Sequence, residues 1–454
     1  MTTMPMPTLT RPPLARMPRI SYQQVNRLGG ILAFLLGCYR QEGPIFRFRM
    51  PGSSEVVTVM AGLEANLFMN RQGGHHLSAS AFRLEQNRAY GASKTLVSLD
   101  GVEHQELRRR QQFGYSRQIL ERQVGRAIAL TVEAAQQFRS DEPLPAHDFL
   151  TKLVAEQIGS LFLDYSPGEH TDDLAYFLRT VVQTTLMRTE PMSQLESERF
   201  LAARQRSWDL AEAMLAARRE STPADRNLLD DLLATQAEAS ELLAPADLRI
   251  AALGPYIAGL DAIANSCSFI LYALLAHTAI LAQVQREVDA LFAAGPVTAQ
   301  GLRGLKTLQK VIMESLRLYP IAPALQGTVT APFTFAGYEI PAGEPIIVAA
   351  AVTHFLPELY PDPETFDIER YSPGRQEHRQ PGAFAAYGLG PHSCLGGSLA
   401  DAQMMLTLAT LLHHFDFAME PAGYQLRVIA NPLPCPSREF TVRITPRHPA
   451  KSTV

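Results

Sequence analysis

Cysteine is scarce in this chain. The 454 residues include four cysteines, and no two of them form a CxxC pair: Cys38, Cys267, Cys394 and Cys435. Disulfide-stabilised folds and structural zinc sites need more cysteines at closer spacing. The scarcity excludes a disulfide framework and a zinc module, and it favours a reducing compartment.

The chain also lacks a marked excess of charge of either sign. Lysine and arginine number 41 and aspartate and glutamate 45, which gives a formal net charge of −4. A nucleic-acid partner recognised by bulk charge needs a basic surface. We therefore expect no nucleic-acid partner.

A long apolar run is missing near the N-terminus. Residues 1–27 are rich in proline, and the first apolar run, at 28–36, contains two glycines and is too short to cross a bilayer. This pattern disfavours a secretory signal and predicts no membrane span. We expect residues 1–27 to be disordered, a helix to begin near residue 28, and the protein to be cytoplasmic.

The most informative stretch that is present is a glycine-rich loop at 387–400. Cys394 lies within it, an apolar helical pattern follows, and four glycines flank the cysteine: Gly388, Gly390, Gly396 and Gly397. N–H groups freed by such a loop, and the positive end of the next helix, favour a thiolate at Cys394. A thiolate of this kind is one of the few protein ligands of haem iron. The alternative is a buried free cysteine at a helix start, which the glycines and His392 disfavour.

At these residues the sequence resembles the cytochrome P450 family. The cysteine signature of that family is Phe-x-x-Gly-x-(Arg/His)-x-Cys-x-Gly, and the corresponding residues here are Tyr387, Gly390, His392, Cys394 and Gly396. The resemblance implies that Cys394 is the axial ligand of haem b and that His392 lies near a haem propionate. The one departure is Tyr387 in place of phenylalanine, which keeps a ring near the sulfur.

A second motif fits the same family. His104 and Arg108 are four residues apart on a basic helix that follows Asp100, so they project from one face. The resemblance implies that both bind a haem propionate; without it, a solvated basic face would be the natural interpretation. Arg109 and Arg110 point elsewhere, and we interpret them as a positive patch for an acidic electron donor.

One anchor common in the family is missing. The family often has an arginine before its central sheet, and residues 325–328 here contain none. Haem binding would then depend more on His104, Arg108 and His392. His354 is a further possible anchor, or else a plain buried histidine.

A long apolar stretch at about 246–277 predicts a buried helix, because its residues are apolar nearly all round. Pro255 and Gly259 predict a local break in its hydrogen bonds. The stretch resembles the central helix of the family, whose signature is (Ala/Gly)-Gly-x-(Asp/Glu)-Thr. Here the signature reads Ala258-Gly259-Leu260-Asp261-Ala262, so the acid is kept and the threonine is replaced by alanine.

The alanine at 262 bears on the oxidant. In the family the threonine hydroxyl stabilises bound dioxygen and passes protons beside the acid, here Asp261, and a methyl group can do neither. A substrate hydroxyl or an ordered water could replace it and leave an oxygenase. The enzyme could instead use peroxide or rearrange a hydroperoxide, or the site could be poorly coupled.

A structural motif of the family is also present. Glu314 and Arg317 are three residues apart on a helical pattern at 301–319, and such a pair is usually a surface ion pair. The resemblance implies instead that the pair is buried and joined by Arg370, so that the trio holds the core around the cysteine loop.

The resemblance also suggests residues of a substrate pocket. Residues 71–98 look irregular in sequence, and in the family this segment lies over the haem. The candidates from this segment, the central helix and the turn at 431–436 are Phe82, Leu84, Tyr90, Ala258 and Leu433. Earlier in the chain, alternation at 45–50 and β-branched residues at 55–60 predict a hairpin.

Together these motifs predict a mostly α-helical single-domain cytochrome P450 fold with small β-sheets over residues 28–445, and a flexible tail at 446–454. The implied function is a monooxygenase that inserts one atom of O₂ into an apolar terpenoid, fatty acid, steroid or polyketide-like substrate. Electrons would come from NAD(P)H through a separate ferredoxin or flavodoxin-type donor and its reductase. We expect the protein to be a monomer. The alternatives are a peroxide-dependent peroxygenase or hydroperoxide isomerase, and a non-enzymatic haem sensor or carrier.

Overall fold

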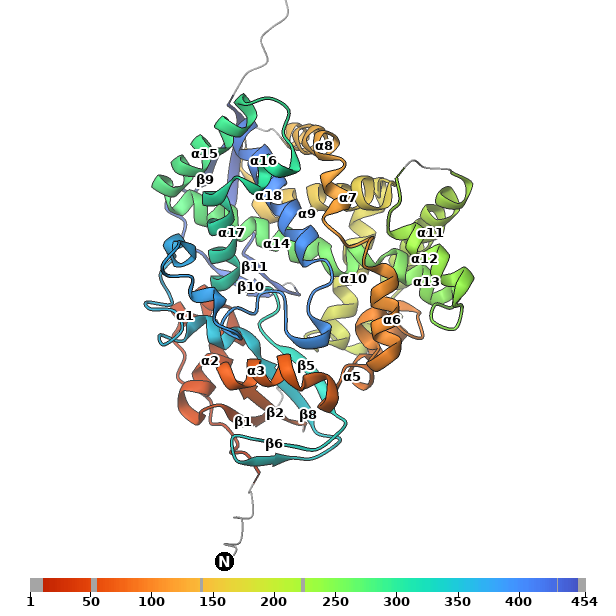
Figure 1. The fold of residues 1–454 in the computed structure, drawn as a ribbon, viewed down its shortest axis with the longest axis vertical. Helices are drawn as coiled ribbons and strands as arrows, with labels where there is room; N and C mark the ends of the chain where they lie inside the picture. The colour runs from red at the N-terminus through yellow and green to blue at the C-terminus, as the bar shows by residue number, and fades with distance from the viewer. Residues whose placement is uncertain (1–10, 50–54, 139–141, 222–224, 431, 448–454) are drawn as a thin grey trace, which may run out of the picture.

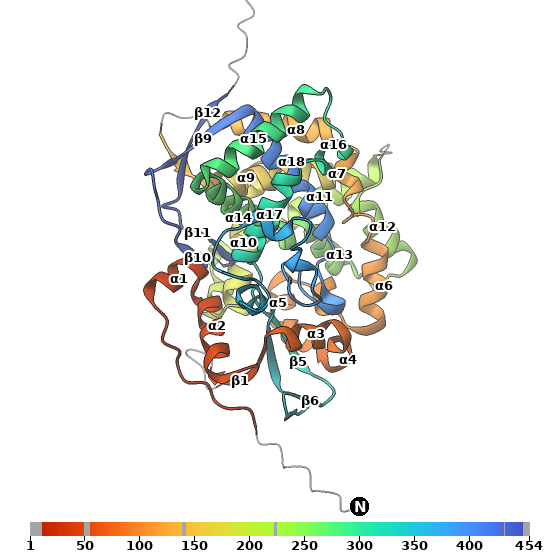
Figure 2. The same ribbon diagram turned by 60° about the vertical axis from the view of Figure 1, so that its left-hand side comes forward.

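The computed structural model describes residues 11–49, 55–138, 142–221, 225–430 and 432–447. Helices make up most of this part of the chain, and they surround the long helix α14 (Gly254–Ala276) (Figure 1). A sheet lies at one end of the molecule beside the N-terminal helices (Figure 2). The arrangement confirms the predicted fold class, mostly α with small β-sheets.

The helices that precede α14 are α1 (Tyr22–Leu28), α2 (Gly30–Glu42), α3 (Leu63–Arg71), α4 (Gly73–His76), α5 (Ser80–Tyr90), α6 (Gly101–Gln111), α7 (Gln118–Glu121), α8 (Val124–Gln137), α9 (Ala146–Gln157), α10 (Thr171–Thr185), α11 (Glu198–Glu220), α12 (Leu228–Glu238) and α13 (Pro245–Ala252). Those that follow it are α15 (Thr278–Ala293), α16 (Ala299–Arg303), α17 (Lys306–Leu318) and α18 (Gly397–His414). Shorter helical segments are the π-helical η2 (Ile158–Leu163) and the 3-10 segments η1 (Leu96–Ser98), η3 (Gly168–His170), η4 (Met192–Glu196), η5 (Ala350–Phe355), η6 (Ile368–Tyr371), η7 (Glu377–Arg379) and η8 (Gly390–His392).

Part of the segment predicted to be disordered is ordered. Ser21 caps α1, since its hydroxyl accepts the N–H of Gln24 at 3.2 Å and its own N–H donates to the Gln24 side chain at 2.9 Å. Upstream, the N–H of Ala15 donates to the carbonyl of Arg47 at 2.7 Å. A capping box and main-chain pairing with a strand hold this segment on the fold. Residues 1–10 lie outside the described residues.

The larger sheet has the strand order β1-β2-β8-β5-β3. Its strands are β1 (Ile45–Arg49), β2 (Val56–Ala61), β8 (Pro345–Ala349), β5 (Leu325–Val329) and β3 (Leu77–Ser78). β1 and β2 pair antiparallel with Phe46 opposite Val59, as the predicted hairpin requires, and its turn lies outside the described residues. β2 and β8 pair in parallel, which joins segments almost 300 residues apart.

Smaller sheets complete the architecture. A hairpin is formed by β6 (Phe333–Phe335) and β7 (Tyr338–Ile340), and a second by β10 (Val428–Ala430) and β11 (Pro434–Pro436). A three-stranded sheet has the order β4 (Leu144–Pro145), β12 (Thr441–Pro446) and β9 (Phe415–Glu420).

The break predicted in the central helix falls earlier than expected. The helical run is interrupted at Leu253, between α13 and α14, and Pro255 occupies the first turn of α14. Proline is tolerated there because the N–H it lacks would have no partner within the helix. The expected break at Gly259 is wrong, since α14 continues through it.

The segment at 71–98 is helical rather than irregular. Asp100 accepts hydrogen bonds from the hydroxyl of Ser78 at 2.6 Å and from the N–H groups of Ala79 at 3.1 Å and Ser80 at 3.2 Å. The Asp100 side chain thus satisfies the start of α5 and does not cap α6, although it occupies the N-cap position of α6. A cap supplied from 20 residues downstream leaves no local signal in the sequence.

Two stretches of the described chain are long and apolar enough to span a membrane by length and composition, Pro245–Ala276 and Gly390–His414. Most of each is buried inside the fold, 67% and 61% of the apolar window respectively. Their apolar character is therefore accounted for by core packing around the cysteine loop.

Candidate functional site

The loop that carries Cys394 runs from η8 into α18. The N–H of Cys394 donates to the carbonyl of Tyr387 at 2.8 Å, which closes the loop. Gly390 has a φ of +66°, and a Cβ there would lie 2.6 Å from the carbonyl oxygen of Met69, so only glycine fits. The N–H of Gly390 donates to the side chain of Asn70 at 3.1 Å. The loop is thereby fixed against α3.

A cavity of about 440 Å³ lies between this loop and α14. Cys394 lines one side of it, while Ala262 lines another. The lining is mostly apolar and includes Leu96, Val97, Leu107, Ile158, Phe162, Leu243, Ile250, Ile257, Ile263, Leu316, Ile321, Leu325, Leu399 and Met404.

The residues around this cavity fit a haem. The α14 wall presents small residues that leave room for a flat ring, Ala258, Gly259 and Ala262. A free cysteine lines the same cavity, and groups that can donate hydrogen bonds to propionates line it as well, namely His104, Arg108 and His392. A thiol, small residues on the facing helix and clustered hydrogen-bond donors together fit a haem.

The loop alone does not make Cys394 acidic. Burial raises the pKa of its thiol, while the N–H of Gly396 and the charge of Arg108 act in the opposite direction without overcoming it. The N–H of Gly396 therefore acts in the predicted direction, and burial outweighs it in the metal-free protein. A bound metal ion is what deprotonates a coordinating thiol in such a setting.

His104 and His392 lie together at the rim of the cavity. Their rings stack with centroids 4.2 Å apart and planes 23° apart, and His392 Nε2 lies 3.2 Å from Asp100 Oδ1. Burial, and then the charges of His392 and Arg108, lower the pKa of His104 to about 4. Burial acts to raise the pKa of Asp100, but its hydrogen bonds, first of all that from His392, hold it well below its usual range.

The arginines of α6 divide between two directions. Arg108 Nη2 donates to the carbonyl of Ser393 at 2.7 Å, beside the cysteine. Arg109 and Arg110 each contact Glu106 at 2.7 Å, and Arg110 also contacts Glu238 at 2.9 Å. The positive patch expected at Arg109 and Arg110 is therefore largely neutralised by neighbouring carboxylates.

On α14, Ala262 lines the cavity but Asp261 does not. Arg179 of α10 binds the Asp261 carboxylate at 2.6 Å through Nη2 and at 3.0 Å through Nε. One turn further along, Ser266 lines the cavity and its hydroxyl donates to the carbonyl of Ala262 at 2.8 Å. Sequence reasoning missed Arg179 and Ser266. Only the spacing of Ser266, four residues after Ala262, could have indicated it.

His354 is a structural histidine. Its ring is fully buried, Nδ1 donates to the carbonyl of Arg317 at 2.9 Å, and Nε2 accepts the N–H of Ala385 at 2.9 Å. Burial, followed by the charge of Arg317, lowers its pKa to about 3, so the ring is neutral. Since both nitrogens are occupied, His354 does not serve as the further anchor considered from the sequence.

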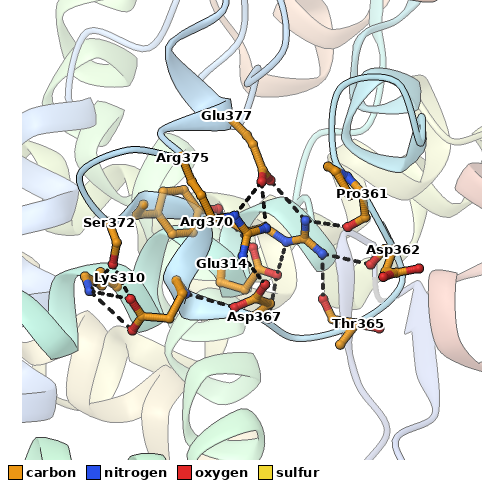
Figure 3. A network of polar contacts seen from close by, with 12 residues as sticks. Lys310, Glu314, Pro361, Asp362, Thr365, Asp367, Arg370, Ser372, Arg375 and Glu377 are labelled. Atoms are coloured by element: carbon orange, nitrogen blue, oxygen red, sulfur yellow. Dashed lines mark hydrogen bonds and ion pairs between the residues drawn. The ribbon is translucent and has the colours of Figure 1, made fainter.

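Glu314, Arg317 and Arg370 form one buried network, and their side chains are at most 1% exposed. Arg317 binds both carboxylate oxygens of Glu314 at 2.8 Å. Arg370 Nε reaches Glu314 Oε1 at 3.2 Å (Figure 3). Arg370 also contacts Glu377 at 3.0 Å. The network joins α17 to the segment before the cysteine loop, as the sequence motif predicts.

The five predicted pocket residues separate into two groups. Tyr90, Ala258 and Leu433 line the cavity. Phe82 and Leu84 do not, and Leu84 is 47% exposed, because α5 is a helix that presents one face inward. Lining residues that the sequence did not indicate include Lys94, Thr95, Gln111, Tyr115 and Asp247.

A second cavity of about 430 Å³ lies behind the cysteine loop, between α7, α17 and α18. Tyr387 lines both cavities, and its hydroxyl donates to Asp401, which lines the second one. Gly397 lies under the Tyr387 ring, since a Cβ there would be 3.3 Å from it. Leu316 lines both cavities as well, so the side chains of Tyr387 and Leu316 lie between them.

Comparisons with known proteins point to one family. A family model described as "Cytochrome P450" matches residues 12–441. "Putative cytochrome P450 120" of Synechocystis sp. is 25% identical over 424 residues, 92% of this chain and 94% of that protein. "Cyclooctat-9-en-7-ol 5-monooxygenase" of Streptomyces melanosporofaciens is 30% identical over 273 residues, 58% and 59% of the two chains. The structure of retinoic acid-bound cyanobacterial CYP120A1 superposes with a TM-score of 0.82 at 23% identity, covering 97% of this chain and 100% of that one.

Proposed function

We propose a function for this protein from one premise: the chain belongs to the cytochrome P450 family. Membership makes it a haem-dependent oxidoreductase, related to known monooxygenases. Membership therefore disfavours the non-enzymatic haem sensor or carrier that the sequence left open.

We assign the haem to the cavity between Cys394 and α14. Cys394 Sγ would be the axial ligand, and the donors at the rim would bind the propionates, namely His104, Arg108 and His392. The loop on the cysteine side would be shaped by Tyr387, Gly390 and Gly396. Once bound, the haem supplies the redox and oxygen chemistry that this family uses.

The reaction we propose is insertion of one oxygen atom from O₂ into an apolar organic substrate. The observation that supports this reaction is that Cys394 and an apolar wall line the same cavity. The wall contains Tyr90, Ala258 and Leu433. Such a wall binds an apolar molecule by burial and excludes water. We propose a terpenoid, fatty acid, steroid or polyketide-like molecule; one relative is named for cyclooctat-9-en-7-ol and a similar structure holds retinoic acid.

Asp261 and Gly259 define the proton-handling side in this proposal. The Asp261 carboxylate is the acid nearest in sequence to Ala262, and Gly259 keeps the wall thin. Arg179 holds both oxygens of Asp261 outside the cavity, so one of these contacts must open before a proton on Asp261 can reach it. With a methyl group at Ala262, the last hydroxyl in that path would come from the substrate or from an ordered water.

A second candidate function is favoured by the same contact. Because Arg179 binds Asp261 at 2.6 Å and Ala262 carries no hydroxyl, the wall has no acid–hydroxyl pair facing the cavity. A peroxide-dependent peroxygenase or hydroperoxide isomerase starts from a peroxide rather than from O₂, and so it does not need that pair. We keep it as the alternative oxidant, with the same haem site.

The remaining parts of the proposal concern the protein as a whole. We propose a single domain that includes α1 and extends through β12, and a monomer in the cytoplasm. Electrons would come from NAD(P)H through a ferredoxin or flavodoxin-type donor and its reductase. A reducing compartment suits the free cysteines described at 38, 267, 394 and 435.

Turnover with two oxidant systems, O₂ with an electron donor or hydrogen peroxide alone, tests the function. The haem-loaded protein is incubated with NADPH and a surrogate ferredoxin and reductase, or with hydrogen peroxide alone, and with terpenoid, fatty acid and steroid substrates. We expect oxygenated product with the reductase system. Product that forms only in the peroxide incubation would favour the alternative. The reduced, CO-bound spectrum of Cys394→Ser is the control for the ligand, because a spectrum equal to wild type would contradict the assignment of Cys394.

A further inference from the structure

Positive charge is concentrated in the N-terminal part of the sequence. Residues 1–41 contain five arginines and no lysine, aspartate or glutamate, although the whole chain has a formal net charge of −4. The first acidic residue is Glu42, which accepts the main-chain N–H of Arg16 at 3.4 Å and forms no ion pair with that side chain. Charge asymmetry of this kind indicates contact with an anionic partner.

Three of the five arginines have no acidic partner. Arg27 and Arg40 contact one shared glutamate. Arg11, Arg16 and Arg19 are exposed, and none of them forms an ion pair within the described residues. The guanidinium group of an exposed, unpaired arginine is always charged and can bind a phosphate or carboxylate that approaches from solvent.

Exposed apolar side chains gather in the same part of the chain. Nine large apolar side chains are exposed among the described residues, and four of them lie between residues 14 and 31, namely Leu14, Met17, Tyr22 and Ile31. Met17 is 81% exposed and Tyr22 is 73% exposed. Single exposed apolar residues are ordinary, but a group this close in sequence indicates an interaction surface.

The backbone that carries these side chains is fixed on the fold. The carbonyl of Pro13 accepts the N–H of Arg47, and the carbonyl of Pro12 accepts Arg47 Nε, both at 2.8 Å. Pro18 is buried, and a Cβ on Gly37 would lie 2.8 Å from its ring, so the segment packs closely on α2. It runs along the outside of α2 and β1 (Figure 2). A partner therefore meets side chains whose backbone is already ordered, which lowers the entropy cost of binding.

We propose that residues 11–31 form a docking surface for an anionic lipid membrane. The arginines bind lipid phosphate groups, and the exposed side chains of Leu14 and Met17 enter the boundary between headgroups and acyl chains. Apolar side chains interleaved with the charges favour a lipid surface over a nucleic acid, whose charged backbone offers no apolar layer. The contact is peripheral and needs no helix across the bilayer. It goes beyond the proposed function and depends on neither haem nor substrate.

Vesicle sedimentation with the haem-loaded full chain tests the docking surface. The protein is mixed with vesicles of phosphatidylcholine alone, or of phosphatidylcholine with phosphatidylglycerol, at low and at high salt. We expect binding to the anionic vesicles only, and weaker binding at high salt because salt screens the charges. The triple variant Arg11→Gln, Arg16→Gln, Arg19→Gln should bind about 100-fold more weakly, since each arginine near an anionic surface contributes about 1 kcal/mol, or about fivefold.

A second variant tests the apolar side chains separately. Leu14→Ser combined with Met17→Ser should weaken vesicle binding about tenfold, because less apolar area leaves water. On immobilised heparin, an anionic polymer without an apolar layer, this variant should elute at the same salt as wild type. Wild-type affinity of this variant for the vesicles would show that charge alone is recognised, as by an acidic protein, and would overturn the lipid assignment.

The matched control removes the same charge elsewhere on the surface. Arg219 of α11, Arg286 of α15 and Arg379 of η7 are exposed and form no ion pair among the described residues. Their triple change to glutamine should leave vesicle binding at the wild-type level. Equal loss in the two triple variants would overturn the proposal, as would wild type that fails to bind anionic vesicles or binds both kinds equally. A normal CO spectrum shows that each variant is folded, and turnover is not needed for any of these measurements.

Discussion

The substitution Glu314→Gln should destabilise the protein more than its small change in shape suggests. The Glu314 carboxylate accepts five hydrogen bonds, two from Arg317, one from Arg370, one from the hydroxyl of Tyr371 and one from the N–H of Asp367. Gln keeps the shape but removes the charge and turns one acceptor into a donor that faces these groups. Arg317 then has no carboxylate among the described residues within ion-pair distance.

The expected loss follows from the burial of these groups. Breaking a buried ion pair by removing one partner costs about 3–5 kcal/mol, out of a total stability of about 5–15 kcal/mol. The matched control is Lys310→Met on the same helix, because the side chains of the Lys310–Glu369 pair are 25% and 59% exposed. An exposed pair of this kind contributes about 0–1 kcal/mol.

Urea unfolding of the haem-loaded proteins measures both changes. A loss below about 1 kcal/mol for Glu314→Gln, equal to that of Lys310→Met, would refute the argument from burial. If Glu314→Gln is not recovered folded, Tyr371→Phe removes one 3.0 Å hydrogen bond from the same carboxylate. That variant should lose about 1.5–3 kcal/mol, as expected for a bond to a charged acceptor.

Three further predictions concern the site. The pKa of Asp100 is lowered in the folded protein, so its stabilisation is present at neutral pH and is lost as the pH falls. Asp100→Asn should be less stable than wild type at pH 7, and the difference measured in acid unfolding curves should begin to shrink below about pH 4. Burial and then the charge of Asp401 raise the pKa of Cys394. Because a negative charge near the iron disfavours its reduced form, Asp401→Asn should raise the haem reduction potential measured by spectroelectrochemistry, and an unchanged potential would show that the charge is screened. Ala262→Thr should raise the product formed per NADPH consumed; a ratio that stays at the wild-type value would mean that the missing hydroxyl does not limit coupling.

Motifs confined to one short segment could be predicted from the sequence. The cysteine loop closes on itself through the bond from Cys394 to Tyr387, and Glu314 and Arg317 are one helical turn apart. In both cases the residues that interact are also neighbours in the chain. Spacing and residue type therefore carried most of the information about the ligand and the buried ion pair.

The remainder depends on contacts between distant segments. Arg179 meets Asp261 across 82 residues, and His392 meets Asp100 across 292. Asp100 was correctly placed at a helix start, but its hydrogen bonds stabilise α5 because the two helices pack together. No local pattern shows which of two nearby helix ends a carboxylate will serve.

The contacts of the cysteine loop also bear on the order in which the chain folds. The loop is held by Asn70, Arg108 and Asp100 across 320, 285 and 292 residues, whereas the partners of Glu314 lie within 57 residues of it. Closing a longer loop costs more chain entropy and slows the formation of the contact. We therefore expect the Glu314 network to assemble early and the loop around Cys394 to close late. Haem capture would then be among the last events of folding, and the loop would be among the first parts to open when the protein unfolds.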